Sequence, residues 1–351
     1  MTETHAQAAE YLNANQFALS ELVMAKHYAL HPELGRPYGP VGRIRCREDA
    51  AFHLSFLAQA LATGVPELFV DYIAWAKVML GSRRVTALDL AQNMEVLRAV
   101  LNDRLPSELA SAALEYVDAG FRALPSLATD SPTLMQTDAP LANIAQEYMS
   151  ALLRFDRAVA YTTIVDAVNG GTSIRDIYEH VFARVQREIG RLWQVNKLTV
   201  AEEHYCTAAT QLVISQLYPR IFNSHRNGRV MVGMCTTGDL HEIGVRMVCD
   251  FFEMEGWDTT YLGANVPISS AVQMVRLRRP EVLAVSATIP FHVTATKNLI
   301  NAVRNEPELE HVRILVGGYA FRVPDLWRAV GADAYGRNAM EAIELGDSML
   351  R

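Results

Sequence analysis

The pattern of hydrophobic positions divides the chain into a helical part and a part in which strands and helices alternate. From residue 1 to about 130, apolar residues recur three and four positions apart, as at Leu54, Leu57 and Leu61, which predicts amphipathic helices. No strand-like alternation of apolar and polar residues interrupts them. Residues 131–140 are rich in Pro, Ser and Thr, which is the composition of a linker. The sequence therefore predicts an all-helical N-terminal domain that ends in a linker.

A second helical unit is predicted over residues 141–226. One long helix is expected over 142–168, where an Asn-Gly-Gly turn closes it, and another over 173–192. A further helix is expected to begin after Thr199, because Thr199 and Glu202 have the spacing of a capping box. Several helices in so short a stretch indicate a small bundle.

Residues 227–351 alternate short apolar runs with amphipathic stretches. The predicted strands are 229–235, 258–262, 281–287, 312–317 and 333–335. Each is followed by a stretch with helical periodicity, and this alternation is typical of a parallel sheet covered by helices. We therefore expect α + α/β architecture: an N-terminal helical domain, a helical bundle, and a flavodoxin-like, doubly wound parallel sheet.

The loop after the first predicted strand holds the residue best suited to bind a metal. It reads Gly238-Asp-Leu-His-Glu-Ile-Gly244 and stands at the carboxyl end of a strand, where open α/β sheets bind ligands. His241 could present a neutral imidazole to a metal. Asp239 could hold the other ring nitrogen and raise the basicity of the ligand. Gly244 lacks a Cβ, so a bulky ligand can approach the backbone there.

This Asp-x-His-x-x-Gly pattern resembles the cobalamin-binding domain shared by methionine synthase, corrinoid proteins and cobalamin photoreceptors. Alone, the motif would equally suit a capped loop, but further strand ends match in the same order. The resemblance implies that His241 ligates cobalt from below, in place of the cofactor's own benzimidazole, while the displaced nucleotide tail enters the sheet. The cofactor-binding residues implied at the other strand ends are Leu262, Gly263, Ser286, Thr288, Gly317 and Gly318.

The helical unit 141–226 contains a second pattern, in which Trp193 is followed after nine residues by Glu203 and His204. The pattern resembles the signature of cobalamin photoreceptors, in which a four-helix bundle caps the upper face of the cofactor. The resemblance implies adenosylcobalamin, with the indole stacked on it and the carboxylate accepting from ribose hydroxyls. The alternative is a core Trp at a helix end beside a solvated Glu–His pair.

The N-terminal domain lacks a basic recognition helix and resembles the helical domain of the photocobilins, which pair cobalamin with biliverdin. The resemblance rests on the overall pattern of 45–54 and 69–75. It implies aromatic walls, cations for the propionates and a candidate thioether cysteine. The residues implied for biliverdin are Arg45, Cys46, Arg47, Asp49, His53, Tyr72 and Trp75. The alternative is an amphipathic bundle with an arginine-rich rim and a core His.

Composition narrows the class of protein. The 351 residues carry a formal net charge of −7, which argues against sequence-independent nucleic-acid binding. No apolar run approaches the roughly 20 residues of a membrane span, and the N-terminus has no signal-peptide core. The four cysteines lack Cys-x-x-Cys spacing, so neither zinc nor a disulfide framework is indicated. We expect a cytoplasmic protein.

These patterns support three functions. The favoured one is a light sensor, not an enzyme: a homo-oligomer that binds adenosylcobalamin base-off, His-on, together with biliverdin. Photolysis of the Co–C bond would change its conformation or oligomeric state and signal to a separate output protein. No fused output enzyme is expected, because Arg351 closely follows the last predicted helix. The second function is a corrinoid protein that carries methyl groups for a separate methyltransferase. The third is a cobalamin binder or store without photochemistry.

Overall fold

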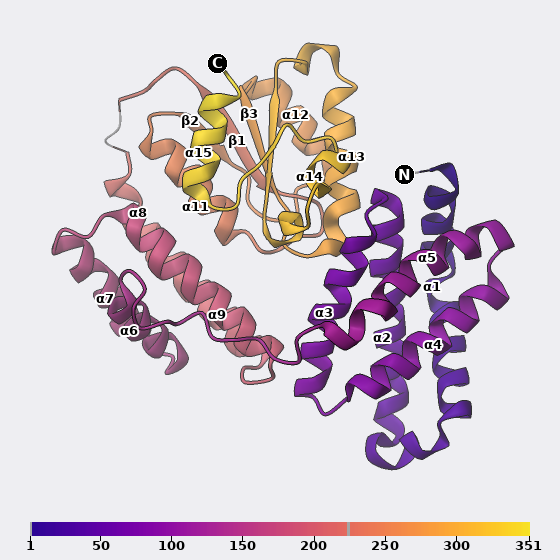
Figure 1. Ribbon diagram of the computed structural model, residues 1–351. Coiled ribbons are helices and arrows are strands. Elements are labelled where there is room, and N and C mark those ends of the chain that lie inside the picture. The colour runs from indigo at the N-terminus through magenta and orange to yellow at the C-terminus, as the bar shows by residue number, and fades with distance from the viewer. Residues whose placement is uncertain (1, 223–224) are drawn as a thin grey trace. The chain divides into compact units, whose positions relative to one another are not determined.

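The computed structural model describes residues 2–222 and 225–351, which form two compact units (Figure 1). The first unit runs to Thr129 and includes the segment Val323–Val330. The second comprises Asp130–Arg322 and Gly331–Arg351. Among the helices of these described residues, none has the length and apolarity needed to cross a membrane.

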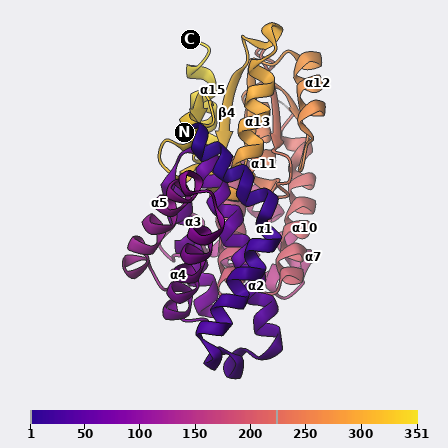
Figure 2. The same ribbon diagram turned by 90° about the vertical axis from the view of Figure 1, so that its right-hand side faces the viewer.

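The first unit is helical through residues 3–126. Its main helices are α1 (Glu3–Leu30), α2 (Gly35–Thr63), α3 (Pro66–Ser82), α4 (Ala87–Arg104) and α5 (Ser107–Ala123), with short 3-10 turns η1 (Pro32–Leu34) and η2 (Leu124–Ser126). Helices α1 and α2 lie antiparallel along one another (Figure 2). Gly64 ends α2 because its φ of +74° is a left-handed conformation that favours glycine. Thr86 and Asp89 form the capping box that begins α4.

The helical bundle of the second unit has more breaks than its hydrophobic pattern predicts. Its elements are α6 (Ala142–Leu153), α7 (Arg157–Asn169), α8 (Ile174–Asp176), the π-helix η3 (Ile177–Phe182), α9 (Ala183–Gln194), α10 (Val200–Leu217) and the 3-10 turn η4 (Tyr218–Arg220). The single helix predicted over 142–168 is wrong. The chain turns at Phe155, whose φ is +59°, and the Asp156 side chain caps α7 by accepting from the Val159 N–H.

The strands form one five-stranded parallel sheet in the order β2-β1-β3-β4-β5, which confirms the flavodoxin-like prediction. The strands are β1 (Val230–Cys235), β2 (Asp258–Tyr261), β3 (Val282–Ser286), β4 (Arg313–Gly317) and β5 (Ala334–Tyr335). The principal helices between and after them are α11 (Ile243–Met254), α12 (Ile268–Arg278), α13 (Val293–Arg304), α14 (Leu326–Ala329) and α15 (Ala339–Ser348). Short 3-10 turns are η5 (Pro290–His292), η6 (Pro307–Leu309) and η7 (Tyr319–Arg322). Helix α11 packs with α15, and α12 packs with α13 (Figure 1).

The register of the sheet aligns the strand ends that the sequence singles out. Cys235 at the end of β1 pairs with Ser286 at the end of β3, and Ser286 pairs with Gly317 at the end of β4. The loops that follow these three strands therefore leave the same edge of the sheet side by side. A site built from residues far apart in sequence can form at this edge.

Within the second unit, the bundle and the sheet share one hydrophobic core. Polar bonds cross between the two parts at the surface of α11. The Tyr178 hydroxyl of η3 donates to Asp250 at 2.8 Å, and Arg246 donates to the Ser215 hydroxyl of α10 at 3.0 Å. Helix α10 is thereby held beside the start of α11, next to the loop that carries His241.

Candidate functional site

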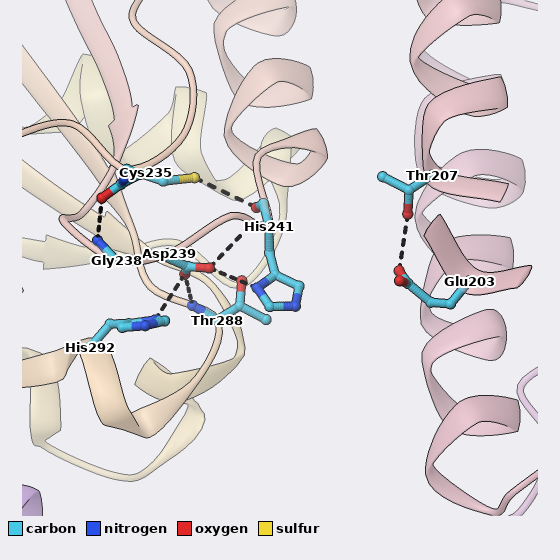
Figure 3. A network of polar contacts seen from close by, with 9 residues as sticks. Glu203, Thr207, Cys235, Gly238, Asp239, His241, Thr288 and His292 are labelled. Carbon is cyan, nitrogen blue, oxygen red and sulfur yellow. Dashed lines mark hydrogen bonds and ion pairs between the residues drawn. The ribbon is translucent and has the colours of Figure 1, made fainter. Parts of the chain in front are cut away.

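The site is centred on a buried carboxylate at the carboxyl edge of the sheet. Asp239 is fully buried, and its Oδ1 accepts the His241 Nδ1–H at 2.7 Å and the His241 backbone N–H at 3.0 Å. Its Oδ2 accepts the backbone N–H of Thr288, from the loop after β3, at 2.5 Å (Figure 3). Burial alone would raise the pKa of Asp239, but the imidazole of His241, then the nearby imidazole of His292 and the two backbone donors, lower it well below its usual range.

The orientation of His241 is set by this carboxylate. Because Asp239 accepts from Nδ1, neutral His241 carries its lone pair on Nε2, which is the nitrogen that can bind a metal. The side chain is half exposed, and the ring points away from the sheet toward α10 (Figure 3). The hydrogen bond to Asp239 raises the pKa of His241. The pair therefore has the geometry of a metal-ligating imidazole backed by a carboxylate.

Helix α10 faces His241 with a polar row at intervals of four residues. Glu203 and Thr207 point toward His241 (Figure 3), and the Thr207 hydroxyl donates to Glu203 Oε1 at 3.0 Å. One turn further, Gln211 donates to Glu242 at 2.6 Å. The sequence prediction included Glu203 but missed Thr207 and Gln211, although their spacing places all three on one helix face.

The other residues of the predicted cap are placed differently. His204 pairs with Glu203 Oε2 at 2.6 Å, and its side chain is 73% exposed. Trp193 is partly buried in the last turn of α9. The His241-facing row therefore contains Glu203 from the predicted set, while His204 lies on the solvated side of the same helix. A role for Trp193 and His204 in binding stays a prediction.

At several strand ends, neighbouring backbone atoms or the backbone conformation limit which residue fits. Gly318 has a φ of +91°, and a Cβ there would lie 2.4 Å from the Ala287 carbonyl, so only glycine fits. Gly263 also has a positive φ, of +81°. Leu262 donates its N–H to the Gly233 carbonyl at 2.9 Å, and Ser286 is buried. For Gly317 the nearest atom to a Cβ would be 3.5 Å away, which any small residue tolerates.

The residues at this edge suit a corrinoid with a histidine below its cobalt. His241 supplies an outward imidazole nitrogen on a rigid support. A Cβ at Gly244 would meet no described atom within 4 Å, so the backbone there is open to a large ligand. At the end of β1, the Thr236 hydroxyl is buried without a hydrogen-bond partner in the described structure. An orphaned polar atom at this position is consistent with a ligand group that enters the sheet.

His292, which the sequence prediction missed, also faces Asp239. Its Nδ1 lies 3.8 Å from Asp239 Oδ2, on the side opposite His241 (Figure 3). His292 is the last residue of the 3-10 turn η5, which follows β3. It lies 51 positions after His241 in the chain, and only the β1–β3 pairing brings the two loops together. The sequence offers one signal for this role, because His292 stands six residues after Ser286, near the end of a neighbouring strand.

In the N-terminal unit, the aromatic residues predicted to wall a bilin pack against one another. His53 is buried, and its Nδ1 lies 2.8 Å from the Tyr72 hydroxyl. Phe56 stacks on Tyr72 with ring centroids 3.9 Å apart, and Trp75 stacks on the same ring at 6.5 Å. Burial lowers the pKa of His53 to about 4. These contacts are those of a core histidine in an aromatic cluster.

The arginines, the cysteine and the aspartate predicted to bind a bilin either pair with other residues of the chain or are shielded from solvent. Arg45 pairs with Glu48 at 2.7 Å, and Arg47 pairs with Glu21 at 3.0 Å. Burial raises the pKa of Cys46 to about 12, which keeps its sulfur in the unreactive thiol form. Burial likewise raises the pKa of Asp49 to about 6. The amphipathic-bundle alternative describes all four residues.

Comparison with known protein families assigns the cofactor class. Residues 229–344 match a family model described as a B12 binding domain, and residues 144–218 match a second model with the same description. These ranges contain His241 and the bundle that faces it. This part of the chain binds a corrinoid. Residues 1–143 lie outside both matches.

The similar proteins are methylamine corrinoid proteins. The dimethylamine corrinoid protein 1 of Methanosarcina acetivorans is 25% identical over 197 residues, covering 54% of this chain and 90% of its own. The trimethylamine corrinoid protein of Methanosarcina barkeri is 26% identical over 203 residues, covering 55% and 90%. The solved monomethylamine corrinoid protein of Methanosarcina barkeri shares the fold, with a TM-score of 0.53 at 21% identity, covering 58% of this chain and 97% of that one.

These findings correct the functional prediction from sequence. The relatives are dimethylamine and trimethylamine corrinoid proteins, so the assignment to photoreceptors, the light-sensor function and its light-dependent oligomer are wrong. The biliverdin assignment to residues 45–75 conflicts with the same relatives and is wrong. The error has a physical origin. The motif residues Asp239, His241 and the strand-end glycines were predicted to lie at the lower face of a corrinoid, and a lower-face site does not specify the reaction on the upper face.

Proposed function

We propose that the chain is a corrinoid protein that carries methyl groups for a separate methyltransferase, the second function considered from sequence. The observation that carries the proposal is the similarity of the bundle and sheet to methylamine corrinoid proteins. The Asp239-backed His241, which points at the bundle, supports corrinoid binding within that two-part module. That module has the same extent as the methylamine corrinoid proteins, which align over 90% of their own length. The proposed partner is a methyltransferase, and the chain itself is the carrier.

In this proposal the chain's residues hold and orient the cofactor. His241 Nε2 would bind the lower face of the cobalt, and Asp239 keeps the ring in the required tautomer. Gly318, Ser286 and the end of β1 would make room for the nucleotide tail. When bound, the corrinoid supplies a cobalt centre that can take up and release a methyl group. The bundle would shield that centre until the partner binds.

The upper ligand of the cofactor is a finer proposal with its own test. A methyl carrier needs no site for a 5′-deoxyadenosyl group, whereas the sequence pattern of Trp193, Glu203 and His204 predicts one. Glu203 faces His241 (Figure 3), so its carboxylate would lie on the upper side of the cofactor under either proposal. A competition titration of methylcobalamin against adenosylcobalamin distinguishes them. A carrier should show no preference for adenosylcobalamin, and Glu203→Ala should change the ratio by less than about threefold.

Methyl transfer by the full chain tests the proposed function. The protein is loaded with hydroxocobalamin, reduced with titanium(III) citrate and alkylated with ¹⁴C-labelled methyl iodide. It is then incubated with an extract of the source cells. We expect about one label per chain, followed by transfer to a small-molecule acceptor faster than from free methylcobalamin. The matched control is His241→Ala loaded in the same way. A parent protein that retains its label, or transfers it no faster than the free cofactor, would contradict the proposal.

A further inference from the structure

The Asp239 carboxylate stands between two imidazoles, and only one of them is needed as a ligand. His241 occupies Oδ1 through two hydrogen bonds. Oδ2 accepts one bond, from the Thr288 N–H, and its remaining face is turned to His292 (Figure 3). A carboxylate oxygen can accept two hydrogen bonds, so Oδ2 has capacity for a second donor.

His292 is buried but lacks the hydrogen bond that its position allows. Its side chain is 12% exposed, and its Nδ1 is buried without a hydrogen-bond partner in the described structure. The distance of 3.8 Å to Asp239 Oδ2 is about 1 Å longer than a hydrogen bond. A buried donor without a partner costs free energy, so other contacts must hold the ring in this position.

The backbone around His292 keeps the ring aimed at Asp239. The His292 N–H donates to the Ile289 carbonyl at 2.9 Å, and its own carbonyl accepts from Thr296 at 3.2 Å. The ring lies against Gly238, where a Cβ would stand 3.1 Å from His292 Cδ2 and where φ is +89°. Glycine at this position therefore provides the space in which the ring lies.

We propose that His292 is a positioning residue that shares the Asp239 carboxylate with His241 and thereby sets how strongly His241 holds the cobalt. The inference rests on the proposed role of His241 as the lower ligand. When His292 closes by about 1 Å and donates to Oδ2, part of the carboxylate's charge is taken up by that bond. The bond from His241 Nδ1–H then weakens, and Nε2 becomes a poorer electron donor. When His292 withdraws, His241 becomes a stronger ligand.

A carrier benefits from a lower ligand of adjustable strength. A strongly donating His241 would stabilise a methyl-bearing cofactor, whereas a more weakly donating His241 would favour release of the methyl group to an acceptor. A movement of one buried side chain changes this strength without moving the sheet. The Thr288 N–H donates to Oδ2 in this structure and would hold Asp239 in place while His292 moves.

The test compares His292→Phe, which keeps the ring and removes the donor, with His292→Asn, whose amide restores a donor near the Nδ1 position. His311→Phe, at an exposed position before β4, is the matched control. Binding of methylcobalamin is followed by absorption. We expect His292→Phe to bind about three- to tenfold more tightly, with a larger His-ligated fraction, and His292→Asn to resemble the parent. His292→Leu replaces the Phe variant if that one does not fold.

A second readout uses the protein without cofactor. In ¹⁵N-histidine-labelled protein, the Nδ1 proton of His241 should move downfield in His292→Phe, because its bond to Asp239 strengthens, and return in His292→Asn. Unchanged affinity and an unchanged His241 signal would overturn the proposal, and so would weaker binding by the Phe variant. If the parent does not bind cobalamin, the corrinoid site itself fails. The signal of His241 in the free protein still decides the role of His292.

Discussion

At the scale of single residues, the sequence predicts contacts within one loop but not contacts between neighbouring loops. Asp239 and His241 are two positions apart at a strand end, so their hydrogen bond follows from local geometry. His292 approaches the same carboxylate from another loop, and that contact depends on the order of β1 and β3 in the sheet. Pairwise contacts of this kind need the folded structure.

Asp250 leads to a prediction about pH. Burial raises its pKa to about 6, from 3.8, while Tyr178 donates to it. Because the folded chain binds this proton more tightly than the unfolded chain, protonation of the carboxyl stabilises the folded state. That contribution is fully present below pH 3.8 and is lost as the pH rises through about 6. In Asp250→Asn, the free energy of unfolding should therefore gain on the order of 2–3 kcal/mol relative to the parent between pH 4 and pH 7.5.

Urea unfolding at the two pH values measures this difference. Asp130→Asn, at an exposed position in the same unit, is the control and should track the parent at both pH values. If Asp250→Asn also tracks the parent, then Asp250 is ionised without cost and burial does not raise its pKa in the folded chain.

At the scale of elements, boundaries with a side-chain signal are predicted well. Thr199 and Glu202 begin α10 through the expected capping box. The break between α6 and α7 was missed, because apolar periodicity continues through it and neither Pro nor Gly marks it. There the chain turns at Phe155 in a left-handed conformation, and Asp156 supplies the cap. The π-helical turn η3 was missed for a similar reason, since its sequence keeps helical character.

The capping box of α10 should matter for cofactor binding, because it begins the helix that carries Glu203 and Thr207. Thr199→Ala should destabilise the second unit by about 1 kcal/mol and weaken cobalamin binding severalfold. Thr86→Ala removes the equivalent box of α4 in the first unit and is the matched control. It should cost similar stability without changing cobalamin affinity. Equal affinity of both variants and the parent would show that the start of α10 does not support the site.

At the scale of the whole molecule, the fold was predictable and the function was not. Alternating strands and helices fix the flavodoxin-like sheet, and the order of the strands agrees with it. The function was mistaken because the lower-face residues of a corrinoid site are shared by proteins with different chemistry. The biliverdin prediction for the N-terminal unit was wrong for a related reason. The cluster around Tyr72 has the composition of a chromophore pocket, but its side chains pack against one another as a core.

The corrinoid site should be independent of the N-terminal unit. The residues named above around His241 belong to the unit that begins at Asp130, and the family matches begin at residue 144. A chain that starts at Asp130 should therefore bind cobalamin within about threefold of the full-length affinity. Isothermal titration of both chains measures this. A truncated chain that folds, by circular dichroism, and does not bind would show that the first unit contributes to the site.

We propose above all that His241 ligates cobalt through Nε2, with Asp239 accepting from its Nδ1–H. It is tested most directly by titrating hydroxocobalamin into the parent and His241→Ala and recording absorption spectra and affinity. The parent should give a base-off, His-ligated spectrum. The variant should lose that spectrum and bind at least about tenfold more weakly, whereas His311→Ala, on the exposed loop before β4, should match the parent. An unchanged spectrum and affinity in His241→Ala would contradict the account.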